Sequence, residues 1–333
     1  MRHLMLALAF VLLPVAAFAA CAGTDLRTTL SPSERAALDT AVAATPYAEG
    51  NHWTARRGDQ TIHLIGTMHL NDPRWPDVVP PLANIVRGSD LLLLEMTAEE
   101  EQKLQAAIAA RPELMFITSG PTLPELMSEE DWTRLRTVMA DLGMPGVLVS
   151  KTQPWMLSVL LGIPACARMQ SEAPLGLDKR LMAVAEDAGI PMQALEPYDT
   201  LFQLFRETPQ EEQIEFLLTS LAGAELAEDQ FATITGTYFD EEPAQAWEMS
   251  RILTQRTTDL PDAEIDAIFA EMEEALMTRR NLAWMDEIAK VDAPTITISV
   301  GALHFVGETG LPRLLEKQGY VLTRAPFGPV AAD

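Results

Sequence analysis

Short apolar runs alternate with amphipathic stretches along this chain. Runs that are continuously apolar, or apolar at every second position, predict strands near 52–56, 61–65, 91–94, 190–195, 295–300 and 320–323. Gly58 and Asp59, between the first two runs, are a hairpin turn signal. The run at 91–94 consists only of leucines, which is typical of a strand buried on both faces of a parallel sheet.

Amphipathic stretches predict helices between these strands, near 34–44, 81–87, 99–110, 129–142, 154–161, 176–188, 262–290 and 309–317. Ser31 or Ser33, followed by Glu34, can cap the first helix, and Gly189 ends the one at 176–188. Strands separated by helices indicate an α/β fold with a mainly parallel central sheet flanked by helices.

Two long stretches, near 98–175 and 199–290, are helical in pattern. We expect them to add a helical layer to the sheet. Residues 21–333 are therefore expected to form a single α/β domain with two helical insertions.

The first residues have the pattern of a signal peptide. A short basic start, Arg2 and His3, precedes an apolar stretch at 4–15, and Ala17-Phe18-Ala19 offers a cleavage site. The apolar stretch is too short to span a bilayer, and no later run reaches the required length of about 20 residues. We therefore expect residues 1–20 to be removed, no transmembrane segment, and a periplasmic or secreted protein.

The chain has two cysteines, Cys21 and Cys166. An oxidising compartment and an even cysteine count favour a disulfide between them. Two alternatives stay open. Cys21 follows Ala19-Ala20 and could carry a lipid anchor, although Phe18 stands where such signals usually have leucine. Both thiols could also be free.

The net charge of −24 changes the list of possible partners. A field of this sign repels phosphate backbones, so we expect no nucleic-acid partner. A peptide or a small molecule is the expected substrate or ligand.

Four predicted strands each end in a side chain that can bind metal or carry a proton: His69, Glu95, Glu196 and His304. In open α/β sheets, ligands bind beyond the carboxyl ends of the strands. Neighbouring strands lie about 5 Å apart, so we expect these four side chains to meet at one edge.

The two histidines share a Gly-x-x-His pattern, from Gly66 and from Gly301, directly after a strand. Glycine allows the strand to stop and turn. Two imidazoles and the Glu95 carboxylate suit a divalent metal such as Mn, Co or Zn. A metal-bound water would be the nucleophile of a hydrolase, and a second carboxylate could take its proton.

Other interpretations of the same residues stay open. Either histidine could be structural, and Glu95 could be paired with an arginine. Asp178 could N-cap its helix. Arg280 could bind a substrate carboxylate or hold Glu95, or it could lie on a solvated helix face.

The chain resembles the TraB/GumN family, which includes the Tiki metalloproteases and is similar to the erythromycin esterases and the ChaN haem-binding lipoproteins. The residues that carry the resemblance are Gly66-Thr67-Met68-His69, Glu95, Gly176-Leu177-Asp178, Leu195-Glu196, Arg280-Asn281 and Gly301-Ala302-Leu303-His304.

The resemblance implies a Tiki-like α/β fold and metal-dependent cleavage of peptides. It implies that His69, Glu95 and His304 bind the metal and that Glu196 is a base or a further ligand. It also implies that the substrate pocket is lined by Asp178, Arg280 and Asn281.

We therefore expect an exported, metal-dependent hydrolase that resembles a peptidase. The alternative is a periplasmic protein that binds haem, a metal or a peptide without turnover.

Overall fold

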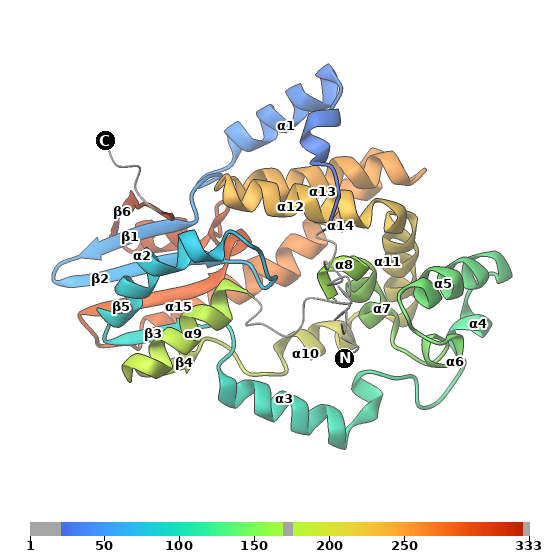
Figure 1. The fold of residues 1–333 in the computed structure, drawn as a ribbon, viewed down its shortest axis with the longest axis horizontal. Coiled ribbons are helices and arrows are strands. Elements are labelled where there is room, and N and C mark those ends of the chain that lie inside the picture. The colour runs from blue at the N-terminus through green and yellow to red at the C-terminus, as the bar shows by residue number, and fades with distance from the viewer. Residues whose placement is uncertain (1–20, 169–175, 329–333) are drawn as a thin grey trace, which may run out of the picture.

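The structure, a computed structural model, describes residues 21–168 and 176–328; the expected signal peptide lies outside these residues. At its centre is a six-stranded mixed sheet with the strand order β4-β3-β5-β2-β1-β6 (Figure 1). The strands are β1 (His52–Arg57), β2 (Gln60–Thr67), β3 (Leu91–Leu94), β4 (Met192–Ala194), β5 (Thr295–Gly301) and β6 (Val321–Arg324).

The sheet is parallel through β4, β3, β5 and β2, and antiparallel where β1 joins β2 and β6. The expected α/β class with a mainly parallel sheet is confirmed. The register pairs Thr67 with Gly301 and Leu94 with Ser299. The carboxyl ends of the four parallel strands therefore lie along one edge of the sheet.

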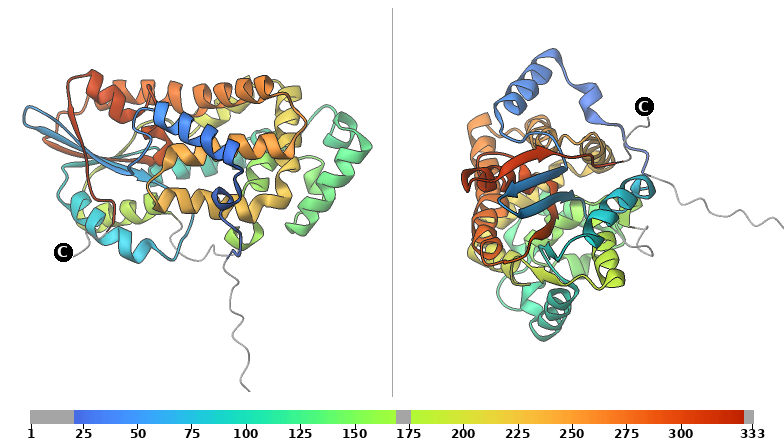
Figure 2. Two further views of the ribbon diagram at one scale, coloured as in Figure 1. Left: turned by 90° about the horizontal axis from the view of Figure 1, so that it is seen from above. Right: turned by 90° about the vertical axis from the view of Figure 1, so that its left-hand side faces the viewer.

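Helices cover both faces of the sheet because the central strands β2, β3 and β5 bury apolar side chains on both sides. On one face, α2 (Trp75–Arg87) and α9 (Leu177–Ala188) pack over Ile65 and Leu92. On the other, α15 (Arg279–Ile288) and α16 (Leu311–Lys317) pack over Leu64, Leu93 and Ile298. Figure 2 shows these two helical layers from the side and from the end.

The additional helices lie beyond the carboxyl edge of the parallel strands (Figure 1). Those within residues 123–161 and 210–222 share a separate apolar core, in which Leu135, Leu157 and Leu217 are fully buried. These helices are α3 (Ala98–Ala110), α4 (Leu123–Leu126), α5 (Glu129–Asp141), α6 (Gly146–Val149), α7 (Pro154–Leu161), α8 (Ala165–Arg168), α10 (Thr200–Glu207), α11 (Gln210–Ala222), α12 (Ala227–Phe239), α13 (Pro243–Thr257) and α14 (Asp262–Glu273).

Two helices differ from the expectation. The helix expected at 262–290 is interrupted by a π-helical turn, Glu274–Thr278, between α14 and α15. Helix α2 begins at Trp75 rather than near residue 81, because Pro76 is tolerated in a first helical turn, where N–H groups lack helical acceptors.

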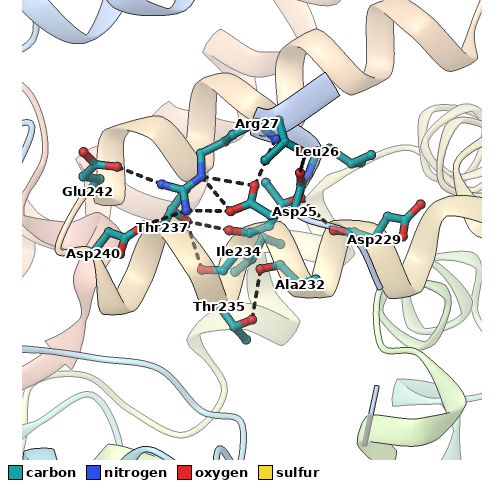
Figure 3. A network of polar contacts seen from close by, with 12 residues as sticks. Asp25, Leu26, Arg27, Asp229, Ala232, Ile234, Thr235, Thr237, Asp240 and Glu242 are labelled. Carbon is teal, nitrogen blue, oxygen red and sulfur yellow. Dashed lines mark hydrogen bonds and ion pairs between the residues drawn. The ribbon is translucent and has the colours of Figure 1, made fainter. Parts of the chain in front are cut away.

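The N-terminal segment runs along α12 and is fixed at both ends. A disulfide joins Cys21 to Cys166 in α8, which confirms the expected pairing and is typical of an oxidising compartment outside the cytoplasm. Figure 3 shows how Arg27 pairs with Asp25, Asp240 and Glu242. Helix α1 (Pro32–Ala44) follows and begins at a capping box.

Among the described residues, no helix combines the length and the apolar character that crossing a bilayer requires.

Removing the disulfide should lower the free energy of unfolding. The bridge closes a loop of 145 residues, and the chain-entropy model gives about 5 kcal/mol for a loop of this length. We expect Cys166→Ser to lower the midpoint of urea unfolding, and dithiothreitol to lower that of the wild type equally. The Cys21→Ser variant is the control. Equal midpoints for the oxidised wild type and the two variants would show that the disulfide does not stabilise the fold.

His63 on β2 should make the protein sensitive to mild acid. Burial, together with the nearby His52 and Arg56, lowers the pKa of His63 to about 4. Its folded pKa lies below that of the unfolded chain, about 6.5. The contribution of neutral His63 to the free energy of unfolding is therefore fully present above about pH 6.5 and is lost as the pH falls towards 4. Melting temperatures across that range should fall less steeply in His63→Gln than in the wild type, and parallel curves would contradict this.

Candidate functional site

Arg280, in the first turn of α15, lies at the centre of the side chains gathered at the carboxyl edge. Its Nε and Nη2 donate to Glu196 at 2.9 and 2.6 Å, and Nη2 also donates to Glu95 at 2.7 Å. Its Nη1 donates to the Leu276 carbonyl at 3.1 Å and lies 3.2 Å from Nε2 of His304. All five N–H groups of a guanidinium therefore have partners within the chain.

The π-helical turn before α15 supplies one of these partners. The backbone N–H of Arg279 bonds to the carbonyl of Glu274, five residues back, as in a π-helix. The Leu276 carbonyl lies within this turn and accepts the hydrogen bond from the Arg280 side chain. Single π turns occur often at functional sites, and this one orients the guanidinium.

Glu95 follows β3 and is held on both of its oxygens. Oε2 accepts from Arg280, and Oε1 accepts from the backbone N–H of Gly301 at 2.7 Å. Burial raises the pKa of Glu95, but its electrostatic interactions with His304, Arg280 and His69 and the hydrogen bond from Gly301 more than offset this and lower the pKa to about 2. Glu95 is therefore a buried carboxylate at neutral pH.

His304 is fixed as one tautomer by Asn281. The Asn281 amide nitrogen donates to the carbonyls of His304 and Thr309, so its oxygen faces His304 Nδ1 at 2.6 Å. Nδ1 then carries the proton, and the Nε2 lone pair faces Arg280. Burial lowers the pKa of His304 to about 4, which keeps the ring neutral at physiological pH.

Glu196 follows β4 and is buried, with its side chain only 10% exposed. It accepts from Arg280 on both oxygens and from the Trp284 indole N–H at 3.0 Å. The Trp284 ring also lies 4.3 Å from the ring of His304. Sequence reasoning missed Trp284, although it stands four residues after Arg280 and therefore on the same face of the helix.

His69 and Asp178 form a second pair at the same edge. Nδ1 of His69 lies 3.2 Å from Oδ1 of Asp178 in an ion pair, and the side chains are 61% and 17% exposed. Desolvation by the surrounding side chains lowers the pKa of His69, but the carboxylates of Asp178 and Glu95 more than offset this and raise it to about 9. The Asp178 carboxylate lies on the Nδ1 side of the ring, at ion-pair distance but outside hydrogen-bond geometry, so Nε2 is the nitrogen that His69 can offer to a ligand or to water.

Asp178 is in the first turn of α9, and Gly176, not Asp178, is the N-cap residue. At Gly176 a Cβ would lie 2.3 Å from the Met68 carbonyl oxygen and 2.5 Å from the Cα of His69. Only glycine allows this close approach. It brings Asp178 beside the first Gly-x-x-His turn.

Tyr238 on α12 connects the additional helices to the same turn. Its buried hydroxyl donates to the Gly66 carbonyl at 2.9 Å. No sequence pattern marked this residue, because the contact joins positions 172 residues apart.

The structure thus brings Glu95, Glu196, Arg280, Asn281 and His304 into one network and places the pair of His69 and Asp178 at the same edge. The roles expected for these residues stay predictions. Among the described residues, no group of three or more His, Cys, Asp or Glu side chains is arranged to hold a metal. The Arg280 guanidinium contacts two of the expected ligands, Glu95 and His304, and its positive charge beside them does not fit a divalent ion in the donor set as placed.

The fold and this edge define an α/β protein with a strand-end site. A family model described as the TraB/PrgY/gumN family matches residues 51–324, and the chain belongs to this family. The protein is also similar to YbaP of Escherichia coli (strain K12) and of Shigella flexneri, both named as uncharacterized proteins. Each is 23% identical over 275 residues, which is 80% of this chain and 94% of the relative.

Replacing Arg280 should destabilise the protein strongly. Arg280→Gln leaves the carboxylates of Glu95 and Glu196 buried without their cation, which typically costs about 3–5 kcal/mol. We expect urea unfolding at pH 7 to show such a loss. Arg279→Gln is the matched control, because Arg279 is 62% exposed and should contribute little. Similar losses in the two variants would argue against the network.

Proposed function

We propose that this protein is a hydrolase of peptide or ester bonds and that His69 is the residue that transfers the proton. One observation supports this most: an exposed imidazole is paired through Nδ1 with the largely buried carboxylate of Asp178. This arrangement of base and orienting carboxylate is the one that hydrolases use to activate a nucleophile.

The proposed reaction needs only this chain and water. Neutral His69 takes a proton from water on Nε2 while the water oxygen bonds to the substrate carbonyl carbon. The bond from that carbon to the leaving nitrogen or oxygen then breaks, and His69 returns the proton to the leaving group. Asp178 holds the ring orientation and stabilises the protonated imidazole between the two steps.

The metal-dependent version, with His69, Glu95 and His304 as ligands of Mn, Co or Zn, requires Arg280 to move away from two of them. Protein stripped of metal by a chelator distinguishes the versions. We expect it to keep its activity, whereas activity that returns only with added metal would support the metal-dependent version.

Binding without turnover is the second candidate, because Nε2 of His69, for which the described residues provide no partner, could equally ligate haem. A visible absorption band that forms with haem and is lost in His69→Ala, without any hydrolysis, would favour it. We place either function outside the cytoplasm, on the disulfide and the pattern of residues 1–20.

His69→Gln should lower kcat/KM about 10²–10⁴-fold on a chromogenic ester or a peptide that the wild type cleaves, because a positioned base contributes that much. His63→Gln is the control, since His63 points from β2 towards His52 and not to this edge. Full activity in His69→Gln would contradict the proposal.

The pH profile tests the role of Asp178. Only neutral His69 can accept a proton, so kcat/KM should rise with pH, reach half of its maximum near pH 9, where half of the rings are neutral, and level off above that. Asp178→Asn removes the carboxylate that raises this pKa and should move the profile to lower pH. Identical profiles for the two proteins would show that Asp178 does not act on His69.

A further inference from the structure

The buried groups around Arg280 are those that usually surround a metal ion: two carboxylates and a neutral imidazole. We propose that Arg280 is the resident cation of this site and that, while it is in place, Glu95, Glu196 and His304 bind no divalent metal. The inference concerns which cation occupies the site, and it goes beyond the proposed hydrolysis because it does not depend on turnover.

The geometry at His304 limits where a metal could bind. Nδ1 is bonded to Asn281, so only Nε2 can ligate a metal. Zinc lies about 2.0–2.1 Å from an imidazole nitrogen. Arg280 Nη1 is 3.2 Å from this Nε2, so a metal near that axis would fall between the two nitrogens, beside a positive charge. The guanidinium and the metal therefore exclude one another.

The carboxylates of Glu95 and Glu196 hold Arg280 in place. Each of the Arg280 contacts to Glu95 and Glu196 is a hydrogen bond between charged groups, at 2.6 to 2.9 Å, in side chains that are 10 to 17% exposed. The remaining Glu95 oxygen is bonded to Gly301, and Trp284 donates to Glu196. Moving Arg280 away would leave two buried carboxylates without their cation, which strongly disfavours the exchange.

The surroundings also hold the guanidinium itself. The Leu276 carbonyl in the π turn accepts from Nη1, and the guanidinium carbon lies 4.9 Å from the centre of the Trp284 ring. A side chain held by a carbonyl, an aromatic ring and two carboxylates is built into the site, whereas a flexible surface arginine would exchange freely.

The test is calorimetric titration of Co²⁺ and Zn²⁺ into chelator-treated protein, with the visible spectrum of Co²⁺ as a second readout. The variants are Arg280→Gln and the matched control Arg279→Gln. We expect wild type and Arg279→Gln to show no binding that depends on His304. Arg280→Gln should gain one site, at least about 100-fold tighter, and should lose it again when combined with His304→Ala.

Two results would overturn the inference. One is tight, stoichiometric binding by the wild type that His304→Ala or Glu95→Gln abolishes. The other is an Arg280→Gln protein that folds but gains no metal site. Should Arg280→Gln not fold, the wild-type titration still decides, and Arg280→Met provides a second variant of similar length. Neither measurement depends on hydrolysis, so failure of the proposed function would be seen separately.

Discussion

The burial of one arginine between two carboxylates and an imidazole is the constraint on which the rest of this site depends. Arg280 uses every guanidinium N–H group within the chain, and its partners come from the ends of β3, β4 and β5 and from the turn before α15. A buried ion pair is favourable only when its geometry is good and its remaining polar atoms are satisfied. Here the parallel strands provide that geometry, because their carboxyl ends meet at one edge.

Neighbouring residues orient the two histidines of the site. Asn281 selects the His304 tautomer whose lone pair faces Arg280, and Gly176 lets α9 approach closely enough to place Asp178 beside His69. Two adjacent centres result. The buried one is held by charged hydrogen bonds between Arg280 and its two carboxylates, whereas the imidazole of His69 is largely open to solvent. Proton transfer is better suited to the exposed centre and structural support to the buried one.

Most of the fold could be predicted from the sequence, because strands and helices differ in hydrophobic period and the four side chains follow strand ends. The meeting of Glu95, Glu196 and His304 followed from that placement. The group that lies at the centre of these three side chains could not be predicted in this way, because it depends on how α15 is rotated about its own axis. A π turn precedes this helix, and no residue pattern in the sequence marks it. The contact of Tyr238 with Gly66 could not be predicted from the sequence either, since it joins residues 172 positions apart along the chain.

The central claim is tested most directly by a crystal structure at high resolution, from crystals soaked in Zn²⁺, Co²⁺ or Mn²⁺ and measured at the absorption edge of the metal. Our account predicts planar guanidinium density between Glu95 and Glu196 and no anomalous peak near His304. An anomalous peak bonded to His304 and Glu95, with Arg280 turned away, would contradict it.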